Sequence, residues 1–211
     1  AVTAMISIRT CKTRGGLASI KEAMTELVIW QRSLPSGFQE WIEQTDGIDL
    51  PDIRILVKPH ELRRALELSI NNSGLKSDKM RDRLAEDISD LVDIFANITK
   101  SEDVDVRLQR INDNACWKFH RDFVETRLLT TYCGPTTEWV QQAYAEKAIQ
   151  EQKDFKGPLE HLAYGDVAIF RGSSTGVKKG IVHRSPPIAD TGITRLMLCL
   201  NQRTPASPDP W

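Results

Sequence analysis

The hydrophobic positions along the chain change their period near residue 101. From residue 19 to about residue 100 they recur at the spacing of an amphipathic helix, and from residue 104 to residue 201 they come in short alternating or β-branched runs. We therefore expect a helical region over residues 1–103 and a strand-rich core over residues 104–203. Residues 204–211 are expected to form a flexible tail, because their prolines lack the N–H donors that a sheet needs.

Three helices are predicted in the first half. Ser19 and Glu22 form a capping box at the start of one helix, which ends near Pro35. Pro59 at a first-turn position opens the second, and residues 71–74 close it. The third carries its apolar residues on one stripe, and the charged residues on its other face are expected to be solvated. The stripe consists of Leu84, Ile88, Leu91, Val92, Phe95 and Ile98.

Short strands separated by turns are predicted in the second half, and their number favours a β-sandwich or a jelly-roll barrel. A helix or lid is expected over residues 142–154, and Lys178 and Lys179 are expected in a solvated turn. The predicted fold class is α+β, with the helical region packed on a C-terminal barrel. The strands are expected at residues 104–111, 116–120, 126–133, 137–141, 166–171, 179–183 and 194–201.

The overall composition argues against several classes of protein. A chain of 211 residues can bury a core without disulfides. With 28 basic and 29 acidic residues the net charge is −1, so we expect no nucleic-acid partner. The longest apolar runs have the length of strands, and no signal-peptide block opens the chain, so we expect a cytoplasmic protein without a membrane partner. The cysteines, which form no CxxC pair, are expected to be reduced thiols; they are Cys11, Cys116, Cys133 and Cys199.

Candidate metal ligands occur in the second half. His120 and Asp122 end a strand-like run, and residues two apart on an extended chain face the same side. His183, at the end of another predicted strand, provides a third ligand. Two histidines and one carboxylate form the facial triad that leaves open positions on a divalent metal. Each residue alone is equally compatible with a structural role, so the prediction depends on the three together.

An arginine follows this set in a strongly apolar run. Arg195 comes twelve residues after His183 and opens the run 196–200. If that strand is buried, the guanidinium needs an anion, because an unpaired buried charge is too costly to keep. A carboxylate bound through two parallel hydrogen bonds is the natural partner.

The order of these motifs is similar to that of the Fe(II)/2-oxoglutarate-dependent dioxygenase superfamily over roughly residues 104–201. More closely, the segments 117–122, 132–139 and 183–187 resemble an uncharacterised bacterial family called domain of unknown function 1826. The resemblance implies that the C-terminal core is a double-stranded β-helix. Two features depart from the superfamily pattern. The gap between His183 and Arg195 is slightly long, and Arg121 places a cation beside the ligands.

Carried over residue by residue, the resemblance implies an oxidoreductase. His120, Asp122 and His183 would hold Fe(II), and Arg195 would bind the distal carboxylate of the cosubstrate 2-oxoglutarate, with Tyr132 as a helper. The expected substrate is a small molecule or a protein side chain, and the sequence does not choose between them.

Arg127 lies on the same predicted strand as Tyr132, residues 126–133. The two positions are an odd number of residues apart, so their side chains should face opposite sides of that strand. We expect Tyr132 to face the pocket. Arg127 is then expected to be a structural ion-pair former.

Zinc chemistry remains open at this point. A non-redox zinc-binding protein of metal homeostasis could use the same three ligands, because zinc accepts imidazole and carboxylate as readily as iron does. A zinc hydrolase is disfavoured, since no H-E-x-x-H helix is present. On an unbroken strand Cys116 would lie more than about 10 Å from His120, too far to share a metal. Cys116 and Cys133 are therefore expected to be small buried residues.

Overall fold

The computed structural model describes residues 8–175 and 180–211, and it contains a larger and a smaller sheet. The larger sheet has the strand order β1-β2-β8-β5-β10-β4-β3, and its strands are antiparallel except for the parallel pair β1 and β2. The smaller sheet has the order β7-β6-β9. The larger sheet contains β1 (Ile8–Cys11), β2 (Leu27–Trp30), β3 (Ile53–Val57), β4 (Val104–Ile111), β5 (Thr126–Cys133), β8 (Val167–Arg171) and β10 (Arg195–Gln202); the smaller contains β6 (Glu138–Trp139), β7 (Glu160–His161) and β9 (His183–Arg184).

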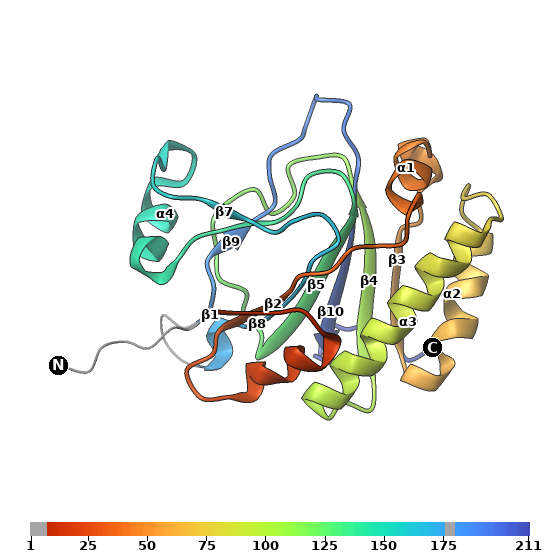
Figure 1. Cartoon of the computed structure of the whole chain (residues 1–211), viewed down its shortest axis with the longest axis horizontal. Helices are drawn as coiled ribbons and strands as arrows, with labels where there is room; N and C mark the ends of the chain where they lie inside the picture. The colour runs from red at the N-terminus through yellow and green to blue at the C-terminus, as the bar shows by residue number, and fades with distance from the viewer. Residues whose placement is uncertain (1–7, 176–179) are drawn as a thin grey trace.

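Helices lie on both sides of the larger sheet. Helices α2 and α3 cover one face, whereas α4 and the smaller sheet lie on the other side (Figure 1). No helix in the described ranges is long and apolar enough to cross a membrane. The α-helices are α1 (Phe38–Glu43), α2 (Leu62–Asn71), α3 (Lys79–Thr99) and α4 (Ala145–Glu151); the 3-10 segments are η1 (Arg14–Lys21), η2 (Gly47–Asp49), η3 (Pro59–Glu61), η4 (Gln142–Tyr144), η5 (Gln152–Asp154) and η6 (Ser173–Thr175).

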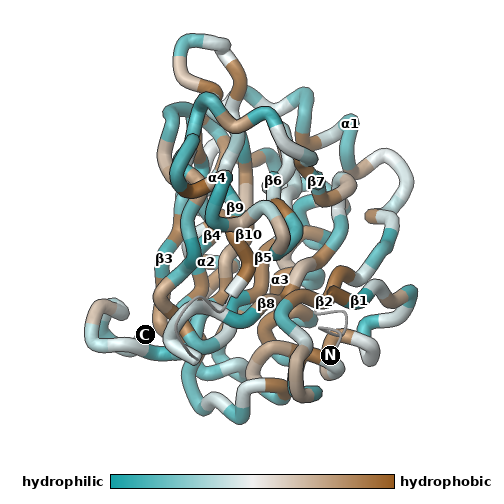
Figure 2. Tube along the Cα trace, turned by 90° about the vertical axis from the view of Figure 1, so that its left-hand side faces the viewer, coloured by the Kyte–Doolittle hydropathy of each residue, from teal (hydrophilic) through white to brown (hydrophobic). Residues whose placement is uncertain are grey.

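The hydrophobic core has two main parts, one on each face of the larger sheet. Leu128 and Tyr132 of β5 pack into the part that α2 and α3 cover. Leu129, the next residue after Leu128, packs into the part between the two sheets. Figure 2 shows hydrophobic colour along β5, β8 and β2 in the centre and hydrophilic colour over much of the α4 segment. Strand β5 therefore has two buried faces, and neither is open to solvent.

Several predicted elements are confirmed. Helices α2 and α3 occur where the periodicity places the second and third helices. Strands β4 and β5 have the predicted bounds, and β8 and β10 differ by one residue at most at each end. The segment 142–154 is helical, as η4, α4 and η5. The predicted turn at Lys178 and Lys179 lies outside the described residues.

The prediction that the N-terminal half is only helical is wrong, because this half also supplies β1, β2 and β3 of the larger sheet. The capping box is not formed: Ser19 lies inside η1 and its hydroxyl donates to the carbonyl of Gly16. Residues 27–30, predicted as the end of a helix, form β2 between β1 and β8. Four consecutive apolar residues are typical of a strand that is buried on both faces, and pairing on both sides outweighs the local helical spacing.

Two smaller expectations also need correction. Residues 116–120 form no strand: Cys116 is exposed with φ of 56°, and only His120 makes an isolated bridge. The tail 204–211 lies along β3, where the N–H of Trp211 donates to the carbonyl of Leu56 at 2.8 Å. Proline lacks this donor, but the residue that follows the last proline supplies it.

Candidate metal centre

His120, Asp122 and His183 lie together in the structure. The Nε2 atom of His120 is 3.2 Å from Asp122 Oδ1, and Nε2 of His183 is 3.0 Å from Asp122 Oδ2. One ligand atom from each of the three residues lies within 4.8 Å of the others. The side chains of Asp122 and His183 are buried, whereas that of His120 is 33 % exposed. The site therefore has one side that faces solvent.

The backbone holds the two histidines side by side. Each of His120 and His183 donates its N–H to the carbonyl of the other at 3.1 Å, so the two residues form a hydrogen-bonded antiparallel bridge. Directly opposed residues of such a bridge point their side chains to the same face, and the two ring centroids are 4.7 Å apart. The bridge thus brings together two residues that are distant in sequence.

Backbone carbonyls also fix the tautomer of each imidazole. Nδ1 of His120 is 2.7 Å from the carbonyl of Lys118, and Nδ1 of His183 is 3.0 Å from that of Ile181. A carbonyl accepts but cannot donate, so each Nδ1 carries a proton and each Nε2 is the ring nitrogen that faces Asp122. An Nε2 atom that carries no proton is a metal-ligand atom of a neutral imidazole. This donor set therefore fits a divalent metal ion.

The carboxylate of Asp122 is ionised and incompletely partnered. Burial raises its pKa, but the contacts with His120, His183 and Arg127 outweigh burial and hold the pKa far below the ordinary value. Arg127 Nη1 is 2.7 Å from Oδ2. Neither this contact nor that of His183 has hydrogen-bond geometry, so buried Oδ2 accepts no hydrogen bond within the described residues. Oδ2 is therefore held by charge contacts alone, and the carboxylate is in the ionised form that a metal ligand needs.

Neighbouring segments fix the loop that carries the first two ligands. The side chain of Gln152 in η5 donates to the carbonyl of Phe119 at 3.0 Å and accepts from its N–H at 2.8 Å. The N–H of Ser173 donates to the carbonyl of Asp122 at 2.8 Å. A Cβ at Gly172 would lie 2.6 Å from that same carbonyl oxygen, so only glycine permits this close approach. The chain is thus anchored on both sides of the H-x-D triplet.

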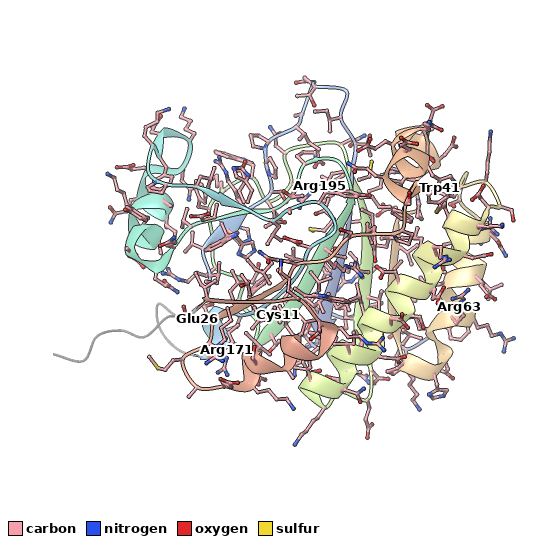
Figure 3. All side chains as sticks on the ribbon, viewed as in Figure 1. Cys11, Glu26, Trp41, Arg63, Arg171 and Arg195 are labelled. Carbon is pink, nitrogen blue, oxygen red and sulfur yellow. The ribbon has the colours of Figure 1, made fainter. Side chains whose placement is uncertain are left out.

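Among the residues that the structure describes, Arg195 has the largest fully buried side chain. Its Nη1 donates to Ser185 Oγ at 2.5 Å and its Nη2 to Thr137 Oγ1 at 2.6 Å and Thr131 Oγ1 at 3.3 Å. Nε has no partner, and no carboxylate forms an ion pair with this guanidinium among the described residues. Burial lowers the pKa of Arg195 to about 10. Arg195 is therefore a cation without a counter-ion, at the upper end of the larger sheet in Figure 3.

A narrow, mostly apolar cavity lies between the two sheets. His183 lines it together with Thr137, whose hydroxyl accepts from Arg195. The lining of the cavity therefore includes a candidate metal ligand and a residue that binds the buried guanidinium. Its other lining residues are Leu27, Leu129, Trp139, Leu162, Ala168, Phe170 and Ile181.

The structure reverses the predicted orientation of β5. Tyr132, expected beside the cosubstrate, faces α3 instead, and its hydroxyl donates to Asp87 Oδ2 at 2.6 Å. Arg127 forms an ion pair, as expected, but with Asp122, a candidate ligand. The alternation rule correctly separated the two residues, but both faces of β5 are buried, so alternation could not say which face meets the site.

The other residues named from the sequence lie outside the site or at its edge. Arg121 turns to Glu146 of α4, with Nη2 to Oε1 at 3.0 Å, rather than to the ligands. Cys133 is buried as expected, whereas Cys116 is exposed, which corrects the prediction for that residue. Neither cysteine belongs to the group that could hold a metal ion.

Comparison with known proteins finds one matching family and several solved structures of similar fold. A family model described as "Protein of unknown function (DUF1826)" matches residues 12–201. No curated protein matches the chain. The dioxygenase for auxin oxidation 1 from Arabidopsis thaliana, solved as a complex with 2-oxoglutarate, is similar at a TM-score of 0.52 and 9% identity, over 98% of this chain and 96% of that chain. This likeness shows a shared fold.

Two further solved structures are similar at lower scores. The rice dioxygenase for auxin oxidation matches at a TM-score of 0.46 and 11% identity, over 93% of this chain and 79% of that chain. A prolyl-4-hydroxylase from Pseudomonas putida matches at 0.42 and 12% identity, over 89% and 100%.

Proposed function

This chain belongs to the family described as "Protein of unknown function (DUF1826)", and we propose that it is a mononuclear non-haem iron oxygenase that uses 2-oxoglutarate and O₂ to oxidise its substrate. In this proposal Nε2 of His120, Nε2 of His183 and the carboxylate of Asp122 hold Fe(II). When bound, iron supplies the activation of O₂ that is coupled to the decarboxylation of 2-oxoglutarate.

Arg195 is the observation that carries the proposal. A buried guanidinium without a carboxylate costs stability, so its retention calls for a function. A site that only stores a metal needs no such cation. A dicarboxylate cosubstrate needs one to bind the carboxylate that does not chelate the metal. Ser185 and Thr137, which already bind the guanidinium, fix its direction.

The remaining residues of the cavity control its solvent content. Its walls are apolar over most of their area, including Leu129, Phe170 and Ile181, so they exclude water from the space beside His183. In a water-poor space the charge of Arg195 acts on a bound carboxylate with little screening. The ring of Phe170, whose centroid is 4.9 Å from that of His183, also limits the rotation of the imidazole.

The first test is an anaerobic titration of metal-stripped protein with Fe(II) and then with 2-oxoglutarate. We expect the weak visible charge-transfer band of the iron chelate, and its loss in His183→Ala. No band in the wild type, together with tight zinc binding, would instead support a non-redox zinc-binding protein that uses the same His/Asp/His site.

Arg195→Met gives a sharper test of the cosubstrate site. Methionine keeps an apolar volume in the core and removes a buried charge, so we expect little loss of stability. The affinity for 2-oxoglutarate should fall at least about a hundredfold, because a charge-assisted hydrogen-bonded pair is lost, while Fe(II) affinity stays unchanged. Equal loss of both affinities, or of neither, in a folded variant would contradict the assigned role; Arg195→Lys provides a charge-retaining control.

A further inference from the structure

Arg127 reaches the candidate metal centre from β5. Its Nη1 lies 2.7 Å from Asp122 Oδ2, and its side chain is 20 % exposed. The other carboxylate oxygen, Oδ1, lies 3.2 Å from Nε2 of His120, so the shortest contact of the guanidinium with the carboxylate is the one to Oδ2. Arg127 therefore approaches the carboxylate from the side of Oδ2, whereas His120 approaches it from the side of Oδ1.

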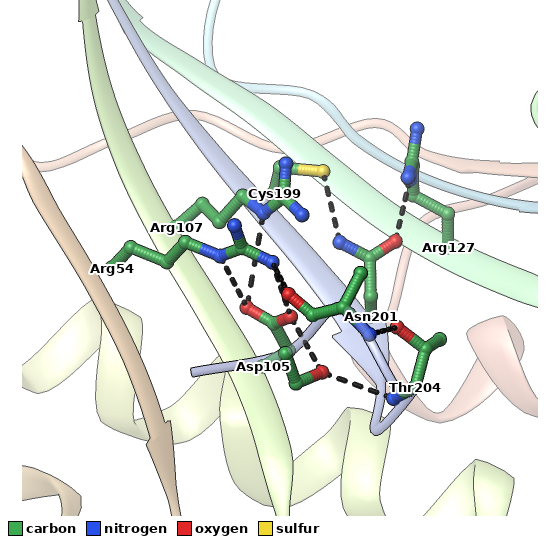
Figure 4. A network of polar contacts seen from close by, with 9 residues as sticks. Arg54, Asp105, Arg107, Arg127, Cys199, Asn201 and Thr204 are labelled. Atoms are coloured by element: carbon green, nitrogen blue, oxygen red, sulfur yellow. Dashed lines mark hydrogen bonds and ion pairs between the residues drawn. The ribbon is translucent and has the colours of Figure 1, made fainter. Parts of the chain in front are cut away.

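A second contact fixes the direction of Arg127. Its Nε donates to Asn201 Oδ1 at 2.6 Å, and Asn201 is the direct cross-strand partner of Arg127 on β10. Because Nε can only donate, the amide must present its oxygen to Arg127, and its nitrogen then donates to Cys199 Sγ at 3.6 Å. Figure 4 shows this chain of contacts. Asn201 is buried, so little room remains for the guanidinium to turn away.

We infer that Arg127, held by Asn201, is a positioning residue that occupies Oδ2 of Asp122, so that Asp122 offers the metal one oxygen only. This inference rests on the proposed function. Two imidazoles and one carboxylate oxygen use three of six positions on an octahedral ion. A carboxylate bound through both oxygens would use a fourth, and the remaining two could not accept both a chelating cosubstrate and O₂.

The charge of Arg127 has a second effect. A guanidinium beside a metal ligand repels the bound cation, and the repulsion grows with the charge of the ion. The cost is larger for Fe(III) than for Fe(II), so Arg127 favours the divalent state that an oxygenase of this kind needs at rest. The contact is partly buried, which weakens screening by solvent.

The test is the reduction potential of bound iron in Arg127→Gln, which removes the charge, and in Arg127→Lys, which keeps it. For Arg127→Gln we expect a lower potential, equivalent to a preference for Fe(II) over Fe(III) reduced at least about tenfold. Arg127→Lys should keep most of the wild-type preference. Asn201→Leu, which retains the guanidinium but removes its anchor, should give an intermediate shift and remains informative if Arg127→Gln does not fold.

Arg107→Gln is the matched control. Arg107 lies opposite Cys199 on β4 and pairs with Asp105 rather than with a candidate ligand (Figure 4). Its removal should shift the potential much less than Arg127→Gln does. Equal shifts in the two variants, or no shift in Arg127→Gln, would overturn the inference. The measurement needs iron but not 2-oxoglutarate. If the wild type binds iron but does not bind 2-oxoglutarate, the proposed function is contradicted, whereas the potentials of the variants can still be compared.

Discussion

Tyr132 joins the larger sheet to α3 through a buried polar cluster. Its hydroxyl and Arg32 both contact Asp87: Tyr132 at 2.6 Å and Arg32 Nη2 at 2.9 Å, each to Oδ2. Burial, followed by the charge of Asp87, raises the pKa of Tyr132 well above its ordinary value. The cluster lies on the helix-covered face of β5, away from the candidate ligands. It therefore supports the fold rather than the site.

Tyr132→Phe tests this placement. We expect the free energy of unfolding to fall by about 1 to 2 kcal/mol at pH 7, because the hydrogen bond to a charged group is lost, with no change in the affinity for 2-oxoglutarate. Chemical denaturation and the iron titration measure the two quantities. A large loss of 2-oxoglutarate affinity in the folded variant would restore Tyr132 to the cosubstrate site.

The pH dependence of the same variant gives an internal check. A raised pKa in the folded state means that protonated Tyr132 contributes stability below its unfolded pKa of about 10. That contribution is lost as the pH rises from there towards the folded pKa. Stability should thus fall less steeply above about pH 10 in Tyr132→Phe than in the wild type.

At the scale of elements, β2 is an inner strand of the larger sheet. It pairs with β1 on one side and β8 on the other, and Val28 faces Ile169 in the register. Leu27 on the same strand lines the cavity beside His183. The N-terminal half therefore forms part of the wall of the candidate site.

Val28→Pro should destabilise the protein by about 3 kcal/mol or more, because proline removes a ladder donor inside a sheet. Val28→Ala is the control: it keeps the N–H and loses only side-chain packing. The midpoint of thermal unfolding should be clearly lower for Val28→Pro than for Val28→Ala. Similar midpoints would mean that β2 contributes little to the sheet.

At the scale of the whole molecule, the C-terminal segment covers the outer edge of β3. Arg54 Nη2 donates to the carbonyl of Ala206 at 2.9 Å, and the hydroxyl of Ser207 donates to Asp105 Oδ2 at 2.8 Å. Asp105 is buried and also pairs with Arg54 at 3.2 Å. Figure 4 shows Arg54 and Asp105 of this network to the left of Asn201. The segment thus covers a sheet edge that could otherwise pair with another chain.

Deletion of residues 204–211 should lower the free energy of unfolding by about 2 kcal/mol, because several hydrogen bonds to buried groups are lost together. It should also promote self-association through the exposed edge of β3. Denaturation and light scattering measure these effects, and Ser207→Ala, which removes a single hydrogen bond, should show much less. A truncated chain that stays monomeric with unchanged stability would contradict this role of the segment.

The sequence by itself determined the candidate ligands, helices α2 and α3, and the bounds of β4 and β5. These features depend on local quantities: the residue types that bind metals, and a period of polar and apolar positions that persists over many residues. His120, Asp122 and His183 could be selected before the fold was known because an H-x-D triplet, a histidine that ends a predicted strand and an arginine in an apolar run follow one another in that order.

Only the tertiary structure decided which elements meet. Residues 27–30 are a strand because β1 and β8 lie on either side of them, and no local pattern contains that information. Alternation placed Arg127 and Tyr132 on opposite faces of β5, but the choice between two buried faces depends on whether α3 or the smaller sheet covers each one. The pairing of a strand and the side of the sheet that each residue faces depend on packing between residues that are far apart in sequence. A local period of polar and apolar positions does not contain this information.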